Sequence, residues 1–149
     1  MRMIFLSLLM FIYSPVSNSE ALAVTITGIE PQRGGYIEVY IFGKVGFPKQ
    51  AEQAVQGKRA SAATESLVFH FDIEMQEFAV KVLHDADSNE KVTKNWTGII
   101  PSEGLGFSNG KTLGLTGPPS YRQCKVKLNK QTKNMNITLR YPGGFGAVQ

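Results

Sequence analysis

The fold is decided by two runs of alternating residues near the middle of the chain, Leu67-Val68-Phe69-His70-Phe71-Asp72-Ile73 and Phe78-Ala79-Val80-Lys81-Val82-Leu83-His84. Every second residue of the first run is apolar, and Phe78, Val80 and Val82 share one side of the second. Side chains alternate between the two faces of a β-strand, so this period of two predicts strands with a buried face. The short polar stretch between them predicts a hairpin.

The same period recurs on both sides of these runs. Residues 24–27 and 36–42 alternate before them, and residues 121–128 and 135–141 alternate after them, which predicts a second hairpin with a polar turn at residues 129–131. Only residues 48–57 have a helical composition. The sequence therefore predicts an all-β protein, a two-layer antiparallel β-sandwich of immunoglobulin-like or transthyretin-like architecture. One short helix and a long irregular loop after His84 complete it.

The N-terminal residues predict export. Arg2 supplies a positive start, residues 4–13 are an apolar run, and Ala21-Leu22-Ala23 is a small-x-small cleavage pattern. A spanning helix needs roughly 20 apolar residues, so we expect a signal peptide over residues 1–23 and no stable membrane anchor. The alternative is a membrane-anchored N-terminal segment. We expect a periplasmic or secreted single domain over residues 24–149, with a mobile tail from about residue 143.

Charge and cysteine usage limit the function further. The formal net charge is +4, and most basic residues near the C-terminus alternate with apolar ones, which is typical of a solvated sheet face. No nucleic-acid partner is expected, whereas an envelope protein or polysaccharide fits the mild charge. Cys124 is the only cysteine, so no intramolecular disulfide forms. Its alternation with Val126 and Leu128 predicts a buried thiol; the alternative is a nucleophile.

The loop after His84 carries part of a calcium-binding pattern. Asp85, Asp87 and Asn89 stand at positions one, three and five of such a loop, and the carbonyl of Lys91 stands at position seven. Position six should be a glycine and is Glu90, and position twelve should be a glutamate and is Trp96. No cofactor is required by this pattern, and calcium is the candidate ion. Its remaining ligands would come from water or from Thr93, Asn95 or Glu103.

The alternative for this loop is an acidic surface turn, in which Asp and Asn side chains cap their own backbone. His84 likewise has three interpretations: a general base, a transition-metal ligand, or a histidine that hydrogen-bonds the adjoining loop. The segment Gly106-Phe107-Ser108-Asn109 either forms a binding rim or plugs the end of the core and satisfies loop backbone groups. Trp96 is a further aromatic candidate. The candidate ligand-binding residues are thus His84, Trp96, Glu103, Phe107, Ser108 and Asn109.

These motifs resemble a known family. The residues that carry the resemblance are His84-Asp85, Asp87, Asn89, Lys91, Asn95, Gly98, Pro101, Glu103-Gly104, Gly106-Phe107-Ser108-Asn109 and Gly117-Pro118-Pro119. Together they look like the signature of an uncharacterised exported bacterial family, the domain of unknown function numbered twenty-one forty-one. The resemblance implies a small exported β-sandwich, mostly from Gram-negative bacteria, and supplies no catalytic residues. Glu90, Thr93 and Ile99-Ile100 depart from the family pattern.

Two functions follow from the sequence. The first is a non-catalytic binding or structural module of the bacterial envelope, whose loops from His84 to Asn109 form its recognition end with or without calcium. The second is a hydrolase, either metal-dependent or acid/base, that uses His84, Asp85, Asp87 and Glu103. Convergence of those four side chains in a pocket would favour the hydrolase. A histidine satisfied by backbone groups would favour the binding module.

Overall fold

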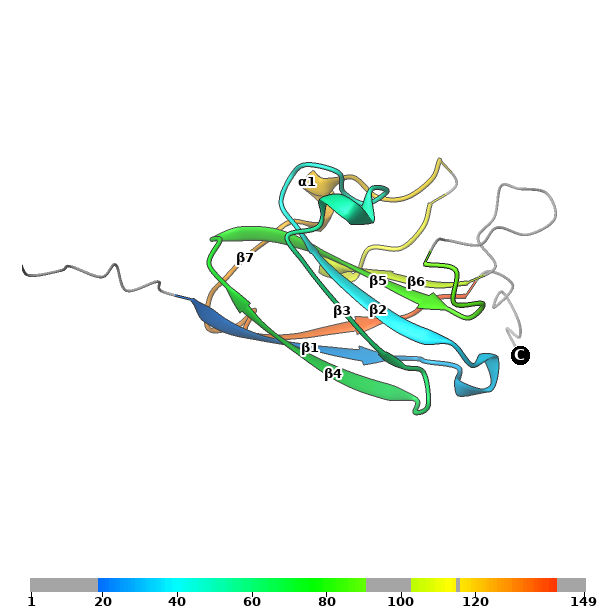
Figure 1. The fold of residues 1–149 in the computed structure, drawn as a ribbon. Helices are drawn as coiled ribbons and strands as arrows, with labels where there is room; N and C mark the ends of the chain where they lie inside the picture. The colour runs from blue at the N-terminus through cyan, green and yellow to red at the C-terminus, as the bar shows by residue number, and fades with distance from the viewer. Residues whose placement is uncertain (1–18, 91–102, 115, 142–149) are drawn as a thin grey trace, which may run out of the picture.

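The computed structural model describes residues 19–90, 103–114 and 116–141. They form two stacked β-sheets, which confirms the all-β sandwich (Figure 1). The first sheet has the order β4-β1-β8, with β1 at Glu20–Thr27, β4 at Ser66–Ile73 and β8 at Asn134–Thr138. The second has the order β3-β2-β5-β6, with β3 at Gln56–Ser61, β2 at Tyr36–Phe42, β5 at Glu77–Asp85 and β6 at Gly104–Phe107. A short strand, β7 at Val126–Lys127, also pairs with β5.

The main core lies between the two sheets and is built by the predicted alternation. The inward residues of β1, β2, β4, β5 and β8 are buried in one cluster, which includes Leu22, Val24, Ile26, Ile37, Val39, Ile41, Phe69, Phe71, Phe78, Val80, Val82 and Ile137. Burying one such aliphatic or aromatic side chain contributes roughly 1.5–3 kcal/mol. The period of two therefore identifies the residues that hold the sheets together.

A second, smaller cluster covers the opposite face of the second sheet. Ala79 and Leu83 of β5 pack there with Leu105, Phe107 and Cys124. Strand β5 is consequently buried on both faces. This explains why its sequence reads as a nearly continuous apolar run.

Both predicted hairpins are wrong. The runs at residues 67–73 and 78–84 are strands β4 and β5, but β4 pairs with β1 in one sheet and β5 pairs with β2 in the other. The chain crosses between the layers at residues 74–76, where the sequence has no Asn-Gly or similar tight-turn dipeptide. Likewise β7 pairs with β5, whereas β8 pairs with β1.

The helix prediction for residues 48–57 is also wrong. A 3₁₀ turn spans only Ala51–Gln53, and the Val55 N–H already donates to the Ile41 carbonyl at 2.8 Å, so sheet pairing overrides helix propensity. The α-helix, α1, instead spans Tyr121–Cys124, where a strand was expected. Its sequence signal is Ser120 followed by Gln123, whose Oε1 accepts the Ser120 N–H at 2.8 Å as in a capping box.

Two pairings distinguish this sandwich from the expected one. Strand β6 lies inside the stretch predicted to be irregular loop, and it pairs antiparallel with β5. Strands β1 and β8 pair in parallel, so the sheets are not purely antiparallel. Leu105 and Arg140 exchange two backbone hydrogen bonds, of 3.0 and 2.9 Å, and so join β6 to the chain that follows β8. An immunoglobulin-like or transthyretin-like relationship stays a prediction.

Strand β1 begins before the expected cleavage point. It starts at Glu20, and Leu22 is fully buried in the main core. Cleavage after Ala23 would therefore remove a core residue. The described part of the chain contains no helix that is long and apolar enough to cross a membrane. The expected tail from residue 143 lies outside the described residues.

Candidate acidic site at the end of β5

The acidic site lies where two neighbouring strands meet the long loop. Asp85 is the last residue of β5, and Glu103 directly precedes β6. The antiparallel register pairs His84 with Gly104, which sets Asp85 opposite Glu103. Both carboxylates are buried, with exposed fractions of 0% for Asp85 and 3% for Glu103. Strand pairing thus unites two acids that are far apart in the sequence.

Three carboxylates converge at this point. Asp85, Asp87 and Glu103 each offer an oxygen, and these oxygens lie within 4.8 Å of one another. Asp87 is exposed. The Ala86 N–H donates to Glu103 Oε1 at 3.0 Å, which fixes Glu103 beside the loop. Like charges at this spacing repel each other when ionised, and oxygen ligands of this kind suit Ca²⁺.

The loop backbone folds around Asp85. The Asn89 N–H donates to Asp85 Oδ1 at 3.0 Å, and the Glu90 N–H donates to Asp85 Oδ2 at 2.8 Å. Asn89 Nδ2 donates to Asp87 Oδ2 at 2.9 Å. The same contacts are expected for the alternative interpretation, in which the loop is an acidic turn whose side chains cap its own backbone. The loop geometry therefore fits both a bare turn and an ion-binding turn.

Glu90 takes the backbone conformation that its position in a calcium loop demands. Its φ is +60°, in the left-handed region that usually calls for glycine. A non-glycine residue there costs about 1–2 kcal/mol. The Glu90 side chain accepts an ion-pair hydrogen bond from Arg59 Nη1 at 3.1 Å, which offsets part of that cost. The sharp turn is thus kept without the glycine that the sequence lacks.

A glycine beside the site permits close packing of the neighbouring turn. Gly35 has a φ of +72°, and a Cβ atom there would lie 2.1 Å from the Asp85 carbonyl oxygen. No side chain fits in that space. Gly35 therefore allows the turn before β2 to pack directly against the end of β5.

His84 is fully buried and points away from the acidic group. Its Nε2 lies 2.7 Å from the Gly34 carbonyl oxygen, so this nitrogen carries the proton and donates. Its Nδ1 accepts from the Tyr141 hydroxyl at 2.6 Å, and that hydroxyl oxygen in turn accepts the Glu30 N–H at 3.1 Å. Both ring nitrogens are therefore engaged in holding Tyr141 and the Gly34 turn.

Gly104 allows this arrangement. A Cβ atom at Gly104 would lie 2.6 Å from the ring of Tyr141, so the tyrosine can lie against β6 only where no side chain intervenes. Burial raises the pKa of Tyr141, which keeps its hydroxyl protonated and able to donate to His84. The adjoining pair Glu103-Gly104 thus serves two purposes, an acid for the site and space for Tyr141.

Phe107 and Ser108 are buried, whereas Asn109 is exposed and bonds to the end of α1. Phe107 is buried in the second apolar cluster. The Ser108 hydroxyl accepts the Val80 N–H at 2.9 Å and donates to the Cys124 carbonyl at 2.6 Å. Asn109 has a φ of +59°, and its Nδ2 donates to the Lys125 carbonyl at 2.9 Å. These contacts attach α1 to the second sheet. Lys91 and Trp96, the other candidates, lie outside the described residues.

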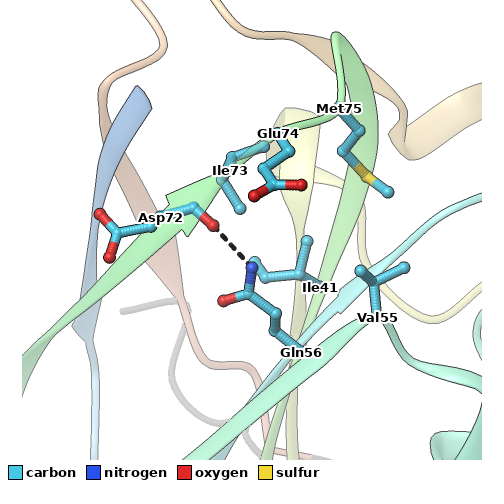
Figure 2. Close-up of a pocket in the computed structure, with 7 residues that line it drawn as sticks. All are labelled: Ile41, Val55, Gln56, Asp72, Ile73, Glu74 and Met75. Atoms are coloured by element: carbon cyan, nitrogen blue, oxygen red, sulfur yellow. Dashed lines mark hydrogen bonds between the residues drawn. The ribbon is translucent and has the colours of Figure 1, made fainter. Parts of the chain in front are cut away.

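Two cavities have linings that do not include the three carboxylates. The larger, of about 310 Å³, is an apolar hollow where Ile41, Val55, Ile73 and Met75 meet (Figure 2). It opens between β3 and β4, the edge strands of the two sheets, and Figure 2 shows Gln56 reaching across to the backbone of Asp72. The smaller, of about 250 Å³, is polar and lies beside Glu38 and Arg59 on β2 and β3. Alternation alone did not single out either cavity.

The fold and the site describe a β-sandwich with an acidic group at one end of its larger sheet. The chain belongs to the family of uncharacterised proteins conserved in bacteria, DUF2141, whose model matches residues 24–136. This confirms the resemblance read from the sequence. No curated protein and no solved structure matches the chain.

Proposed function

We propose that the protein is a non-catalytic binding module of the bacterial envelope, and that a calcium ion bound by Asp85, Asp87 and Glu103 orders its loop end. The single observation that supports the ion site is the convergence within 4.8 Å of three carboxylates, from the end of β5, the turn after it and the residue before β6. Glu103 supplies the acid that position twelve of the loop lacks. Calcium takes six to eight oxygens, so loop carbonyls and water would complete its shell.

The position of the site suggests what the ion would do. Asp85 receives two loop N–H groups, and Glu103 receives one, so the carboxylates already hold the loop from both strands. A divalent cation would cancel the repulsion among them and fix the same loop more firmly. Such an ion would act as a structural clamp for a recognition surface.

The N-terminal sequence supports export to the envelope as part of this proposal. The basic start, the apolar run over residues 4–13 and the Ala21-Leu22-Ala23 pattern are typical of a signal peptide, and the family occurs in bacteria. An envelope protein or polysaccharide is the proposed partner. Periplasmic and extracellular calcium would be available to such a site.

The hydrolase remains the alternative. The convergence of Asp85, Asp87 and Glu103 is the feature that it shares with the binding module. His84 argues against it, because a general base needs a free ring nitrogen, and both of its nitrogens have partners in Gly34 and Tyr141. A base role would require His84 to give up one of these bonds.

Calcium titration with thermal melting tests the proposed ion site. A ligand that binds only the folded protein at one hundred times its Kd adds about 2.7 kcal/mol of stability, which raises Tm by several degrees in a domain of this size. We expect this rise in the wild-type protein at millimolar calcium. Asp87→Ala and Glu103→Gln should abolish it.

The matched control is Asp72→Ala, which removes an exposed aspartate on β4, far from the group in the sheet order. It should keep the full calcium response. The ion site is refuted by an unchanged wild-type midpoint, or by equal shifts in all four proteins.

A further inference from the structure

The smaller cavity is built from charged and aromatic residues on the outer face of the second sheet. It holds about 250 Å³ and is lined by Glu38, Tyr40, Gly57, Lys58, Arg59 and Glu90. Ile37, Val39 and Ile41 alternate with Glu38 and Tyr40 and face the main core, so the cavity lies on the opposite side of β2. The carboxylates of Asp85, Asp87 and Glu103 do not line it, although the Glu90 N–H donates to Asp85 Oδ2.

Glu38 is the least expected residue in this cavity, because its exposed fraction is only 3%. Its Oε2 accepts the Tyr40 hydroxyl at 2.7 Å. Its Oε1 lies 3.9 Å from Arg59 Nε, which is beyond hydrogen-bond distance. A carboxylate has about four acceptor sites, and the Tyr40 hydroxyl fills only one of those on Glu38. Glu38 therefore has capacity for another donor on the cavity side.

Arg59 is held in place opposite Glu38. Its guanidinium carbon lies 3.9 Å from the centre of the Tyr36 ring, and its Nη1 donates to Glu90 Oε1 at 3.1 Å. The side chain is still 41% exposed. A guanidinium has five N–H donors, so Arg59 can serve both Glu90 and a ligand. The result is a fixed donor facing a fixed acceptor.

Lys81 adds positive charge behind this pair. It is 6% exposed and stands opposite Tyr40 in the strand register, with its ammonium 5.9 Å from the centre of the Tyr40 ring. Among the described residues the Lys81 ammonium has no hydrogen-bond acceptor. Burial lowers the pKa of Lys81, and the charge of Glu38 opposes this shift only in part.

The cavity also offers an aromatic surface. The Tyr40 ring lies over Gly57, where a Cβ atom would stand 3.2 Å from the ring. Tyr36 is 37% exposed beneath Arg59. The charges around the cavity nearly cancel, because Glu38 and Glu90 oppose Arg59 and the more deeply placed Lys81, whereas the Lys58 ammonium is directed to β4, where it donates to the His70 carbonyl. A strongly charged ligand would thus meet repulsion from one pair or the other.

We propose that this cavity binds one neutral sugar unit of an envelope polysaccharide. Each sugar hydroxyl both donates and accepts, so one or two adjacent hydroxyls satisfy Glu38 Oε1 and Arg59 together. The apolar C–H face of the ring packs against the tyrosines. The cavity, of about 250 Å³, is smaller than most small-molecule sites, so it has room for no more than a single sugar unit. A zwitterion satisfies the same two charges but lacks the apolar face.

The test is an NMR titration of the isotope-labelled exported protein at saturating calcium, so that an empty ion site cannot cause failure. The probes are glucose, galactose, N-acetylglucosamine and short oligosaccharides of each, with glycylglycine as the zwitterionic probe. We expect at least one sugar to shift the amide signals of Glu38, Tyr40, Gly57 and Arg59, and glycylglycine to leave them unchanged.

Arg59→Ala should weaken that sugar at least tenfold. Arg33→Ala is the matched control, because Arg33 also lies over a tyrosine, Tyr141, and pairs with a glutamate, Glu30, but does not line the cavity. Arg33→Ala should bind as the wild type does. The proposal is overturned by the absence of localised sugar shifts, by a response to glycylglycine alone, or by wild-type affinity in Arg59→Ala.

Discussion

Cys124 illustrates how burial sets the chemistry of a single side chain. It is fully buried at the end of α1, against Leu83, Leu105 and Phe107 of the second cluster. Burial raises the pKa of its thiol from 9.0 to about 11, with a smaller opposing effect from Lys111. The nucleophilic form of cysteine is the thiolate, so this thiol is inert near neutral pH. The geometry agrees with the buried thiol that alternation indicated, although the residue lies in a helix.

The raised pKa of Cys124 predicts a loss of stability in alkali. Below pH 9 the thiol is protonated in both the folded and the unfolded chain. Between about pH 9 and 11 the unfolded chain releases this proton and the folded chain retains it, so the free energy of unfolding falls as pH rises. The loss is on the order of 2 kcal/mol.

Urea unfolding of the wild type and of Cys124→Ala at pH 8 and near pH 10.5 measures this contribution. Cys124→Ala has no thiol and so lacks this pH-dependent contribution. Lys81, whose pKa burial lowers, contributes to stability with the opposite pH dependence, and it is present in both proteins. We expect the stability difference between the two proteins to narrow at the higher pH. A difference that is the same at both pH values would contradict the prediction.

At the scale of the element, β4 shows how the sandwich protects an exposed sheet edge from pairing with other chains. It is an edge strand with Val68 53% exposed at its middle. Three of its carbonyl groups accept side-chain hydrogen bonds: Ser66 from Thr64 Oγ1, His70 from Lys58 Nζ and Asp72 from Gln56 Nε2 (Figure 2 shows the last). Lys58 and Gln56 belong to β3, so these bonds also bridge the edges of the two sheets. Edge strands left uncovered pair readily with other chains.

Removing the side chains of Gln56 and Lys58, which bond two of these carbonyl groups, should therefore promote self-association. We expect Gln56→Ala/Lys58→Ala to form more dimers and larger species than the wild type at equal concentration, measured by sedimentation velocity. The matched control is Lys130→Ala/Gln131→Ala, which changes the same residue types in the exposed turn before β8. Equal association in all three proteins would show that the two side chains do not protect the strand.

At the scale of the whole molecule, β1 links distant parts of the chain. It lies between β4 and β8, and its inward residues Leu22, Val24 and Ile26 enter the core shared by both sheets. The two sheets are also joined by the backbone bonds between Leu105 and Arg140. A shared core of this kind should unfold as one cooperative unit.

The residues before Val24 should contribute to the stability of this cooperative unit. A chain that starts at Val24 loses Leu22 from the core and the first four pairs between β1 and β4. Loss of a buried leucine costs about 2–5 kcal/mol. Compared with a chain that starts at Glu20, we expect a lower midpoint in urea but still one transition, monitored by circular dichroism. Equal midpoints, or two separate transitions in either chain, would contradict this account.

The sequence predicted strands better than their partners. Residues 36–42 form β2 as expected, and the expected strands at residues 24–27, 67–73 and 78–84 lie within β1, β4 and β5. The polar strand β3 was missed, because an edge strand with exposed residues need not alternate. Both hairpins failed, because the distribution of consecutive strands between the sheets depends on long-range packing.

The amino-acid sequence by itself determined the β character, the inward residues of the main core and the acid-rich loop after β5. These features are local, since a period of two and a run of side-chain oxygens can be read within one segment. Only the tertiary structure decided that Glu103 joins Asp85 and Asp87, that His84 holds Tyr141, and that Glu38 faces Arg59. Each depends on strand register or sheet assignment, which the closing of a shared core fixes and no single segment encodes.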